Sequence, residues 1–167
     1  RYITVRTALA GITALLLSFL LGPWLIRFLK EKQIGQEIRA EGPQSHYSKK
    51  GTPSMGGLLI IGATLTSTIL WGKLDNTYVW LAVAAMFFFG LIGFIDDFMK
   101  TRRKRSKGLS GRHKLLLQFV LAAAIGLALI YLGFENKFSL RMSLPFIKQW
   151  VPYLGWFYLP WIIFILV

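Results

Sequence analysis

Two adjacent carboxylates, Asp96 and Asp97, are the residues in this sequence that most clearly suggest chemistry. They lie in the stretch "GFIDDFMK", directly after the apolar run "VWLAVAAMFFFGLIGFI". A carboxylate inside a membrane helix costs about 2.5–3.5 kcal/mol at mid-depth and less near the interface. The partial negative charge at the C-terminal end of a helix adds to that cost. A positive charge must therefore stabilise the pair.

Two sources of that positive charge are open. Lys100 follows Asp96 by four residues, a spacing that favours an ion pair on a helix. The alternative is a hard cation, because Mg²⁺ takes one or two carboxylates and completes its shell with water and substrate phosphates. We favour this hard-cation site, in which one or both of Asp96 and Asp97 bind Mg²⁺. Because neighbouring helical side chains project about 100° apart, at most one points straight at a given site.

A strongly basic stretch, "KTRRKRSKGLSGRHK" (residues 100–114), follows the pair and holds eight Lys or Arg residues and no acid. Most such loops only fix membrane topology or attract anionic lipid headgroups. A cluster of this density also suits a nucleotide diphosphate or a lipid phosphate, which Arg binds through a planar fork and Lys as a point charge. Both interpretations stay open.

A second polar stretch, "SHYSKKGTPSMGG" (residues 45–57), precedes an apolar run. Thr52 suits the N-cap and Pro53 the first position of a helix, so we expect a helix to start there. The unpaired N–H groups at a helix N-terminus favour an anion. Lys49 and Ser54 beside that N-terminus are therefore candidate phosphate-binding residues.

The composition is that of a membrane protein: 54% of the 167 residues are hydrophobic and the mean hydropathy is +0.53. The apolar runs are continuous, unlike the alternating segments of about ten residues in a membrane β-barrel, so we predict an all-α polytopic fold. We treat residues 1–167 as one membrane domain. The five expected spans cover residues 7–29, 55–71, 78–98, 115–132 and 153–167.

The charged connections orient these spans. Residues 30–54 hold five Lys or Arg against three Glu, and residues 100–114 hold eight against none. The positive-inside rule therefore places both connections in the cytoplasm and the N-terminus outside. The net charge of +13 is explained by these loops, so we expect membrane lipids as partners and no nucleic acid.

The sequence stops inside the apolar stretch "YLPWIIFILV". A chain terminus at that depth would place a polar carboxylate in lipid, which is costly. We therefore expect these residues to be part of a longer protein.

Three motifs, "SHYSKKGTPSMGG", "GFIDDFMK" and "KGLSGRHKLLLQ", occur in an order and topology that resemble the bacterial phospho-N-acetylmuramoyl-pentapeptide transferases. The vicinal acidic pair is shared with the wider superfamily of polyprenyl-phosphate N-acetylhexosamine-1-phosphate transferases. The resemblance covers essentially the whole chain. It implies about ten transmembrane helices in the bacterial inner membrane and an active site on the cytoplasmic face.

The resemblance also implies a reaction and its participants. Such enzymes move phospho-N-acetylmuramoyl-pentapeptide from UDP to undecaprenyl phosphate, use Mg²⁺ and release UMP. Asp96 and Asp97 match the family's acidic pair, so the resemblance implies that both are catalytic. Lys49 and Ser54 match polar positions before the second span, where many members have Thr in place of Ser54. Lys100, Lys104 and Lys107 fall in the basic loop of the active site. A homodimer is a further partner to consider.

Further family motifs are expected after the fifth helix: an Asn/Asp-rich segment, another magnesium-binding aspartate and a histidine-rich loop. None occurs in these 167 residues, so we expect the remaining Mg²⁺ ligands beyond Val167 and no activity from this stretch alone. Two alternatives stay open. One is a transferase for another N-acetylhexosamine-1-phosphate. The other is a non-catalytic membrane subunit that binds lipid phosphates.

Overall fold

The computed structural model describes residues 2–31, 55–102, 108–135, 139–142 and 151–167. Regular secondary structure in these ranges is helical, which confirms the predicted all-α class. The helices are α1 (Ile3–Glu31), α2 (Gly57–Trp71), α3 (Thr77–Arg102), α4 (Gly111–Phe134), the short 3-10 helix η2 (Gly155–Phe157) and α5 (Tyr158–Leu166).

Three of these helices, α1, α3 and α4, are long and apolar enough to cross a membrane. The second and fifth predicted spans correspond to shorter apolar helices, α2 and the η2–α5 segment Gly155–Leu166. At 1.5 Å per residue, the 15 residues of α2 extend for about 22 Å, less than the ~30 Å hydrocarbon core. The membrane character of the prediction holds, but three of the five segments, not all five, reach spanning length in the described residues.

The start of α2 differs from the prediction. The helix begins at Gly57, with Gly56 as an N-cap that makes no side-chain capping bond. Met55 has a φ of +72°, in the left-handed region, so a right-handed helix cannot run through it. The predicted helix start at Thr52 and Pro53 is therefore wrong for α2. Both residues lie outside the described ranges.

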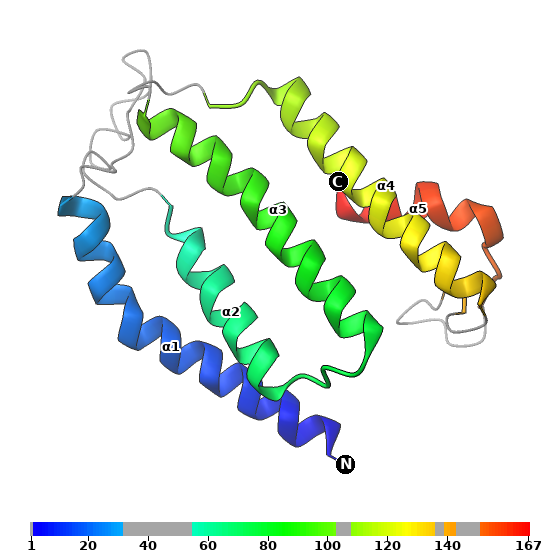
Figure 1. Ribbon diagram of the computed structural model, residues 1–167, viewed down its shortest axis with the longest axis horizontal. Helices are drawn as coiled ribbons and strands as arrows, with labels where there is room; N and C mark the ends of the chain where they lie inside the picture. The colour runs from blue at the N-terminus through cyan, green and yellow to red at the C-terminus, as the bar shows by residue number, and fades with distance from the viewer. Residues whose placement is uncertain (1, 32–54, 103–107, 136–138, 143–150) are drawn as a thin grey trace. The chain divides into compact units, whose positions relative to one another are not determined.

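The chain divides into two compact units, residues 1–110 and 111–167. In the first unit α1 packs against α2 and α2 against α3 (Figure 1). Consecutive helices run in opposite directions. The C-terminal end of α1, the start of α2 and the C-terminal end of α3 therefore lie at the same end of this unit (Figure 1).

Specific contacts hold the three helices of the first unit together. The indole Nε1 of Trp71 donates a hydrogen bond to Thr13 Oγ1 at 3.0 Å, which joins α1 and α2. A Cβ added at Gly90 of α3 would lie 2.5 Å from Ile61 Cδ1, so the missing side chain lets α3 approach α2 closely. The packing depends on a small residue and an interhelical hydrogen bond, as expected where lipid offers no hydrophobic driving force.

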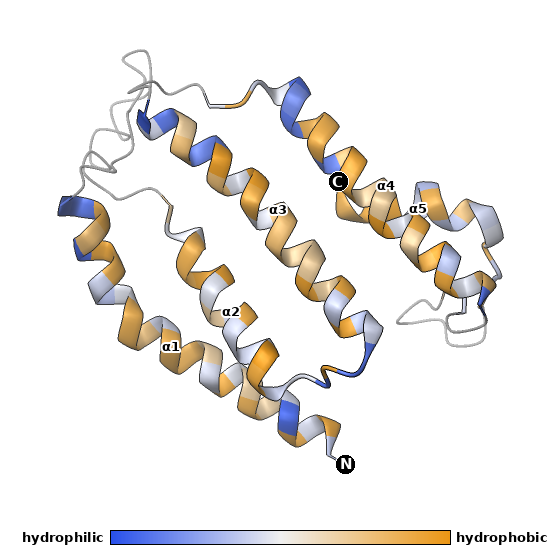
Figure 2. Cartoon of the chain, in the orientation of Figure 1, coloured by the Kyte–Doolittle hydropathy of each residue, from blue (hydrophilic) through white to orange (hydrophobic). Residues whose placement is uncertain are grey.

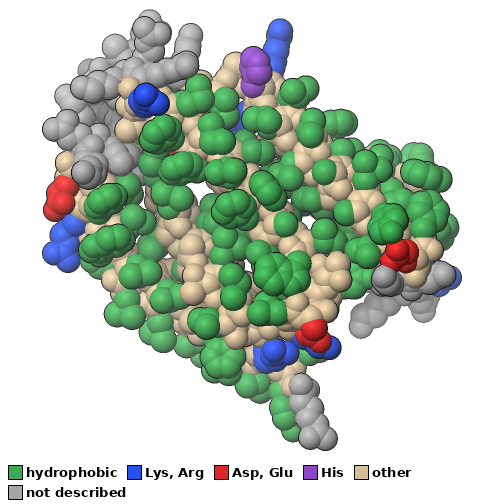
Figure 3. All heavy atoms as spheres, viewed as in Figure 1, with side chains coloured by type: hydrophobic (Ala, Val, Ile, Leu, Met, Phe, Trp, Pro, Cys, Tyr) green, Lys and Arg blue, Asp and Glu red, His purple; other side chains and the backbone are tan. Residues whose placement is uncertain are grey.

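Much of the apolar surface faces outward. Phe19 and Leu20 on α1 are more than two thirds exposed, as is Phe164 on α5. Figure 2 shows hydrophobic residues along the helices and hydrophilic residues concentrated near helix ends, and Figure 3 shows hydrophobic side chains over most of the visible face. A water-soluble monomer rarely exposes such continuous apolar surface, whereas a lipid-facing helix does.

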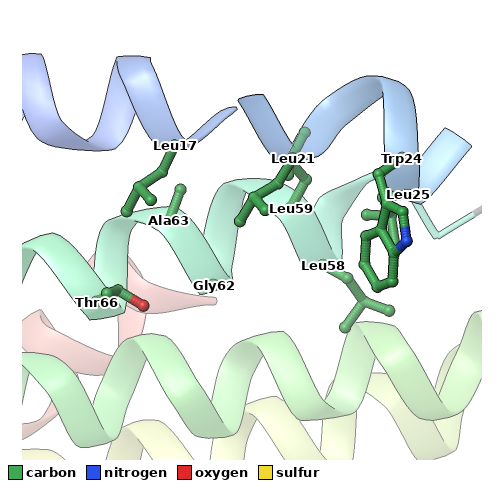
Figure 4. A pocket seen from close by; sticks show the side chains of 9 residues that line it. All are labelled: Leu17, Leu21, Trp24, Leu25, Leu58, Leu59, Gly62, Ala63 and Thr66. Atoms are coloured by element: carbon green, nitrogen blue, oxygen red, sulfur yellow. The ribbon is translucent and has the colours of Figure 1, made fainter. Parts of the chain in front are cut away.

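An apolar groove lies between α1 and α2 (Figure 4). Trp24 and Leu25 of α1 line one end of it together with Leu58 of α2, and Thr66, with its hydroxyl group, lies at the other end. The remaining lining residues are Leu17, Leu21, Leu59, Gly62 and Ala63.

The second unit is built from α4, η2 and α5. A Cβ at Gly126 of α4 would lie 2.6 Å from Ile162 Cγ2 and 2.8 Å from Leu159 Cδ1, so this glycine lets α5 pack closely against α4. The segments before η2 pair through an isolated antiparallel bridge between Arg141 and Tyr153. The Leu154 amide completes this pairing by donating to the Leu140 carbonyl at 2.9 Å.

Candidate active site at the C-terminal end of α3

The carboxylate pair lies near the C-terminal end of α3, which runs to Arg102, four residues beyond the predicted boundary at residue 98. This extension places Lys100 and Arg102 in the last helical turn. Their positive charges offset the partial negative charge of the helix end, one of the two penalties expected for Asp96 and Asp97. The helix therefore supplies part of the stabilising charge itself.

Asp96 is the enclosed member of the pair, with a side chain only 10% exposed. Its Oδ2 lies 2.6 Å from Lys100 Nζ, a close ion pair across one helical turn. Its Oδ1 accepts a hydrogen bond of 2.8 Å from the backbone N–H of Leu109. Both carboxylate oxygens thus have strong donors, so the charge of Asp96 is compensated within the protein.

Asp97 is the accessible member, with a side chain 37% exposed. Its Oδ1 accepts a hydrogen bond from Lys100 Nζ at 3.1 Å. Its backbone carbonyl accepts one from Thr101 Oγ1 at 3.0 Å. Asp97 shares its cation with Asp96, so the three side chains together carry a formal charge of −1. One carboxylate is therefore enclosed and one stays open to an incoming cation.

Lys100 joins the two carboxylates although they project about 100° apart on the helix. It reaches Asp96 at a spacing of four residues and Asp97 at a spacing of three. Its flexible stem lets one ammonium group, with three donors, lie between them. The ion pair between Asp96 and Lys100, one of the two sources of positive charge that the sequence left open, is present in the structure, and the same lysine also binds Asp97.

Gly108 and Leu109 also contribute to the site, although neither was among the predicted site residues. The Leu109 N–H reaches Asp96 across 13 residues of sequence, so the chain contacts α3 again within the basic stretch. Gly108 lies against the Asp96 carboxylate, where a side chain has no room. The only sequence signal was a glycine immediately following the run of Lys and Arg.

The other predicted site residues, Lys49, Ser54, Lys104 and Lys107, lie outside the described residues. The structure therefore brings together Asp96, Asp97 and Lys100 of the predicted set. Among the described residues no group of three or more His, Asp or Glu side chains is placed to hold a metal ion. The Mg²⁺ site stays a prediction.

Two family models match the sequence. The model described as "Glycosyl transferase family 4" matches residues 79–167, more than half of the chain, including the carboxylate pair. The chain belongs to this family. A second model, "Phospho-N-acetylmuramoyl-pentapeptide-transferase signature 1", matches residues 49–61, which include Lys49, Ser54 and the start of α2. The resemblance inferred from the motifs is confirmed.

Curated relatives carry the same name. Phospho-N-acetylmuramoyl-pentapeptide-transferase from Desulfatibacillum aliphaticivorans is 53% identical over 152 residues, covering 91% of this chain and 41% of the relative. The protein of that name from Thermodesulfovibrio yellowstonii is 45% identical over 167 residues, covering 100% of this chain and 46% of the relative. The protein of that name from Solibacter usitatus is 49% identical over 151 residues, covering 90% of this chain and 40% of the relative. The chain thus spans less than half the length of these relatives.

Proposed function

We propose that this chain is part of an enzyme that transfers phospho-N-acetylmuramoyl-pentapeptide from UDP to undecaprenyl phosphate, forming a lipid-linked peptidoglycan precursor and UMP. The observation that carries this proposal is the match of residues 49–61 to a signature of that transferase. Relatives of that name, 43–53% identical over at least 90% of this chain, support it. The acceptor and the leaving group follow from the resemblance of the motifs.

The reaction is a phosphoryl transfer. An oxygen of the lipid phosphate attacks the sugar-proximal phosphorus of the donor, and the bond from that phosphorus to the bridging oxygen breaks as UMP leaves. A phosphate monoester has a second pKa near 6 and is already mostly dianionic at pH 7. A general base is therefore not essential, and the protein acts mainly by positioning the reactants and neutralising charge.

The carboxylate pair suits a Mg²⁺ ion in its donor chemistry, since both residues offer hard oxygen ligands. Asp97 fits better as a ligand because its side chain is the more exposed and its partner, Lys100, is 39% exposed. Asp96 already has close donors at both oxygens. In this proposal Asp97 holds the ion, which supplies charge neutralisation at the phosphates when bound.

The cationic residues bind the phosphates of the two substrates in this proposal. Lys100 lies beside Asp97, where its ammonium group can also meet an anion. Lys49, Ser54, Lys104 and Lys107 are proposed as further phosphate contacts, on the matches of residues 49–61 and 79–167 to the two models.

The test is a transferase assay on the complete protein purified in detergent. We expect UMP release that requires UDP-N-acetylmuramoyl-pentapeptide, undecaprenyl phosphate and Mg²⁺ and that stops with EDTA. Residues 1–167 assayed alone should release no UMP. Activity with UDP-N-acetylglucosamine instead would support the related transferase, and no Mg²⁺-dependent binding of either nucleotide sugar would support a non-catalytic subunit.

We also propose that the end of the first unit carrying Asp96 faces the cytoplasm of a bacterial inner membrane and that the N-terminus lies outside. The charge balance of residues 30–54 and 100–114 supports this orientation. The chain contains no cysteine, so a single cysteine at Asp75 or Ser110 reports its own side of the membrane, once any cysteines elsewhere in the protein are replaced. In intact cells an impermeant maleimide should label Asp75→Cys and not Ser110→Cys. The reverse pattern would invert the topology.

A further inference from the structure

The carboxylate of Asp96 holds together two parts of the chain that are distant in sequence. One is Lys100 on the same helix, with Nζ 2.6 Å from Oδ2. The other is the backbone at Leu109, whose N–H donates to Oδ1 at 2.8 Å. We call the contact of Asp96 with Lys100 and with the Gly108–Leu109 backbone the clasp.

The clasp depends on glycine at position 108. A Cβ added there would lie 2.7 Å from the Asp96 carbonyl oxygen and 2.9 Å from Lys100 Cε, and closer still to Asp96 Oδ1. Carbon atoms do not approach oxygen or other carbon atoms this closely, so a side chain would push the Gly108–Leu109 backbone away from α3. Two of these three neighbours belong to a nearly buried residue, one of them in the helix backbone, so they cannot move aside at little cost.

We propose that Gly108 is a positioning residue for the carboxylate pair. It lets the Leu109 N–H bind Asp96, which fixes the Asp96 side chain and, through Oδ2, the ammonium of Lys100. Because Lys100 also contacts Asp97, the clasp sets where the accessible carboxylate and its cation lie relative to each other. In this arrangement Asp96 orients the site and Asp97 contacts the bound ion or substrate. The inference rests on the proposed transferase function and deepens it.

The first experiment tests whether the clasp is present and does not require the enzyme to be active. Hydrogen exchange at the Leu109 amide is measured in the complete protein in detergent, by mass spectrometry with fragmentation to single residues. We expect exchange at least about tenfold slower than for an unbonded amide, because the N–H is held by a carboxylate. The protection should be lost in Asp96→Ala and Gly108→Ala and kept in Asp97→Ala.

The second experiment separates positioning from binding. In Gly108→Ala, kcat should fall at least about tenfold, because a displacement of about 1 Å in the reacting groups costs up to 10²-fold. The KM for the nucleotide-sugar donor should stay within about twofold. Gly111→Ala is the matched control: a Cβ there meets no atom of the described residues within 4 Å, so both the exchange rate of Leu109 and kcat should match the wild type.

The outcomes are distinct. Fast exchange of Leu109 in the wild type, or protection that survives Asp96→Ala, overturns the clasp. A protected wild-type amide that Gly108→Ala exposes without change in kcat overturns the positioning role. If Gly108→Ala does not accumulate as folded protein, the exchange rates of Leu109 in the wild type, Asp96→Ala and Asp97→Ala decide whether the clasp exists. A wild-type protein inactive with every donor refutes the proposed function instead, and the exchange result stands apart from it.

Discussion

The two ends of α3 each have a lysine–aspartate pair, but the pairs differ in their surroundings. Just before α3 begins, Lys73 Nζ lies 3.3 Å from Asp75 Oδ2, with side chains 64% and 71% exposed. Near its C-terminal end, Lys100 Nζ lies 2.6 Å from Asp96 Oδ2, and the aspartate side chain is 10% exposed. The same two residue types are solvated at one end and enclosed at the other.

The difference shows which pair is built into the protein. An exposed ion pair is worth about 0–1 kcal/mol, so nothing else in the turn at residues 72–76 needs to adapt to it. An enclosed carboxylate must have its hydrogen bonds satisfied, and the chain at Leu109 bends back to α3 to do so. The enclosed pair is therefore the one whose geometry the fold specifies.

Among single substitutions, the largest effect is expected from Asp97→Asn in the complete protein. Asp97 is the accessible carboxylate, and loss of its charge removes a proposed Mg²⁺ ligand. Since charge neutralisation by such an ion is worth several kcal/mol and each 1.36 kcal/mol is tenfold, kcat should fall at least about 100-fold. The thermal unfolding midpoint should barely change. Asp75→Asn is the control and should keep full activity; near-normal turnover in Asp97→Asn would refute the proposed role.

Asp96→Ala should lower both activity and stability. It leaves the Leu109 N–H without its acceptor and Lys100 without its closest partner. An unsatisfied buried polar group costs about 1–3 kcal/mol, and because this hydrogen bond is only partly buried we expect the free energy of unfolding to drop by about 1 kcal/mol. Asp96→Asn keeps an acceptor oxygen and should lose less stability. Equal unfolding free energies for Asp96→Ala and Asp75→Ala would show that enclosure does not matter here.

The helices were predictable from the sequence because lipid leaves the backbone few options. A continuous apolar run must satisfy its own hydrogen bonds, so each predicted span coincides with a helix. The residues at which the helices begin and end were less predictable. Hydropathy falls after Phe98, yet α3 continues to Arg102 because Lys and Arg are good helix formers that suit a helix C-terminus. The left-handed φ of Met55, which delays α2, has no sequence signal.

The candidate site was likewise predictable only in part. The pairing of Asp96 with Lys100 follows from a spacing of four residues, which any helix brings together. The bond from the Leu109 N–H joins residues 13 positions apart, a separation that no helical spacing predicts. Local periodic contacts were therefore accessible to prediction, and the long-range backbone contact that distinguishes Asp96 from Asp97 was not.

Lys100→Met and Lys73→Met compare the two pairs through their cations. Lys100 serves two carboxylates, one of them nearly buried, so its loss leaves Asp96 poorly compensated. Since Lys100 itself is 39% exposed and water screens part of the effect, we expect a loss of about 1–2 kcal/mol of unfolding free energy. Lys73→Met should change it by less than about 0.5 kcal/mol. Chemical denaturation in the same detergent measures both.

The smallest effect is expected when the exposed pair is reversed. Lys73→Asp combined with Asp75→Lys keeps both charges in a solvated turn, so stability and kcat should stay within experimental error of the wild type. Asp96→Lys combined with Lys100→Asp also keeps both charges. It nevertheless places a lysine where the Leu109 N–H needs an acceptor, and an ammonium group has only donors. That reversal should abolish activity. If both reversals were tolerated equally, it would not matter which of residues 96 and 100 carries the carboxylate and which the ammonium group.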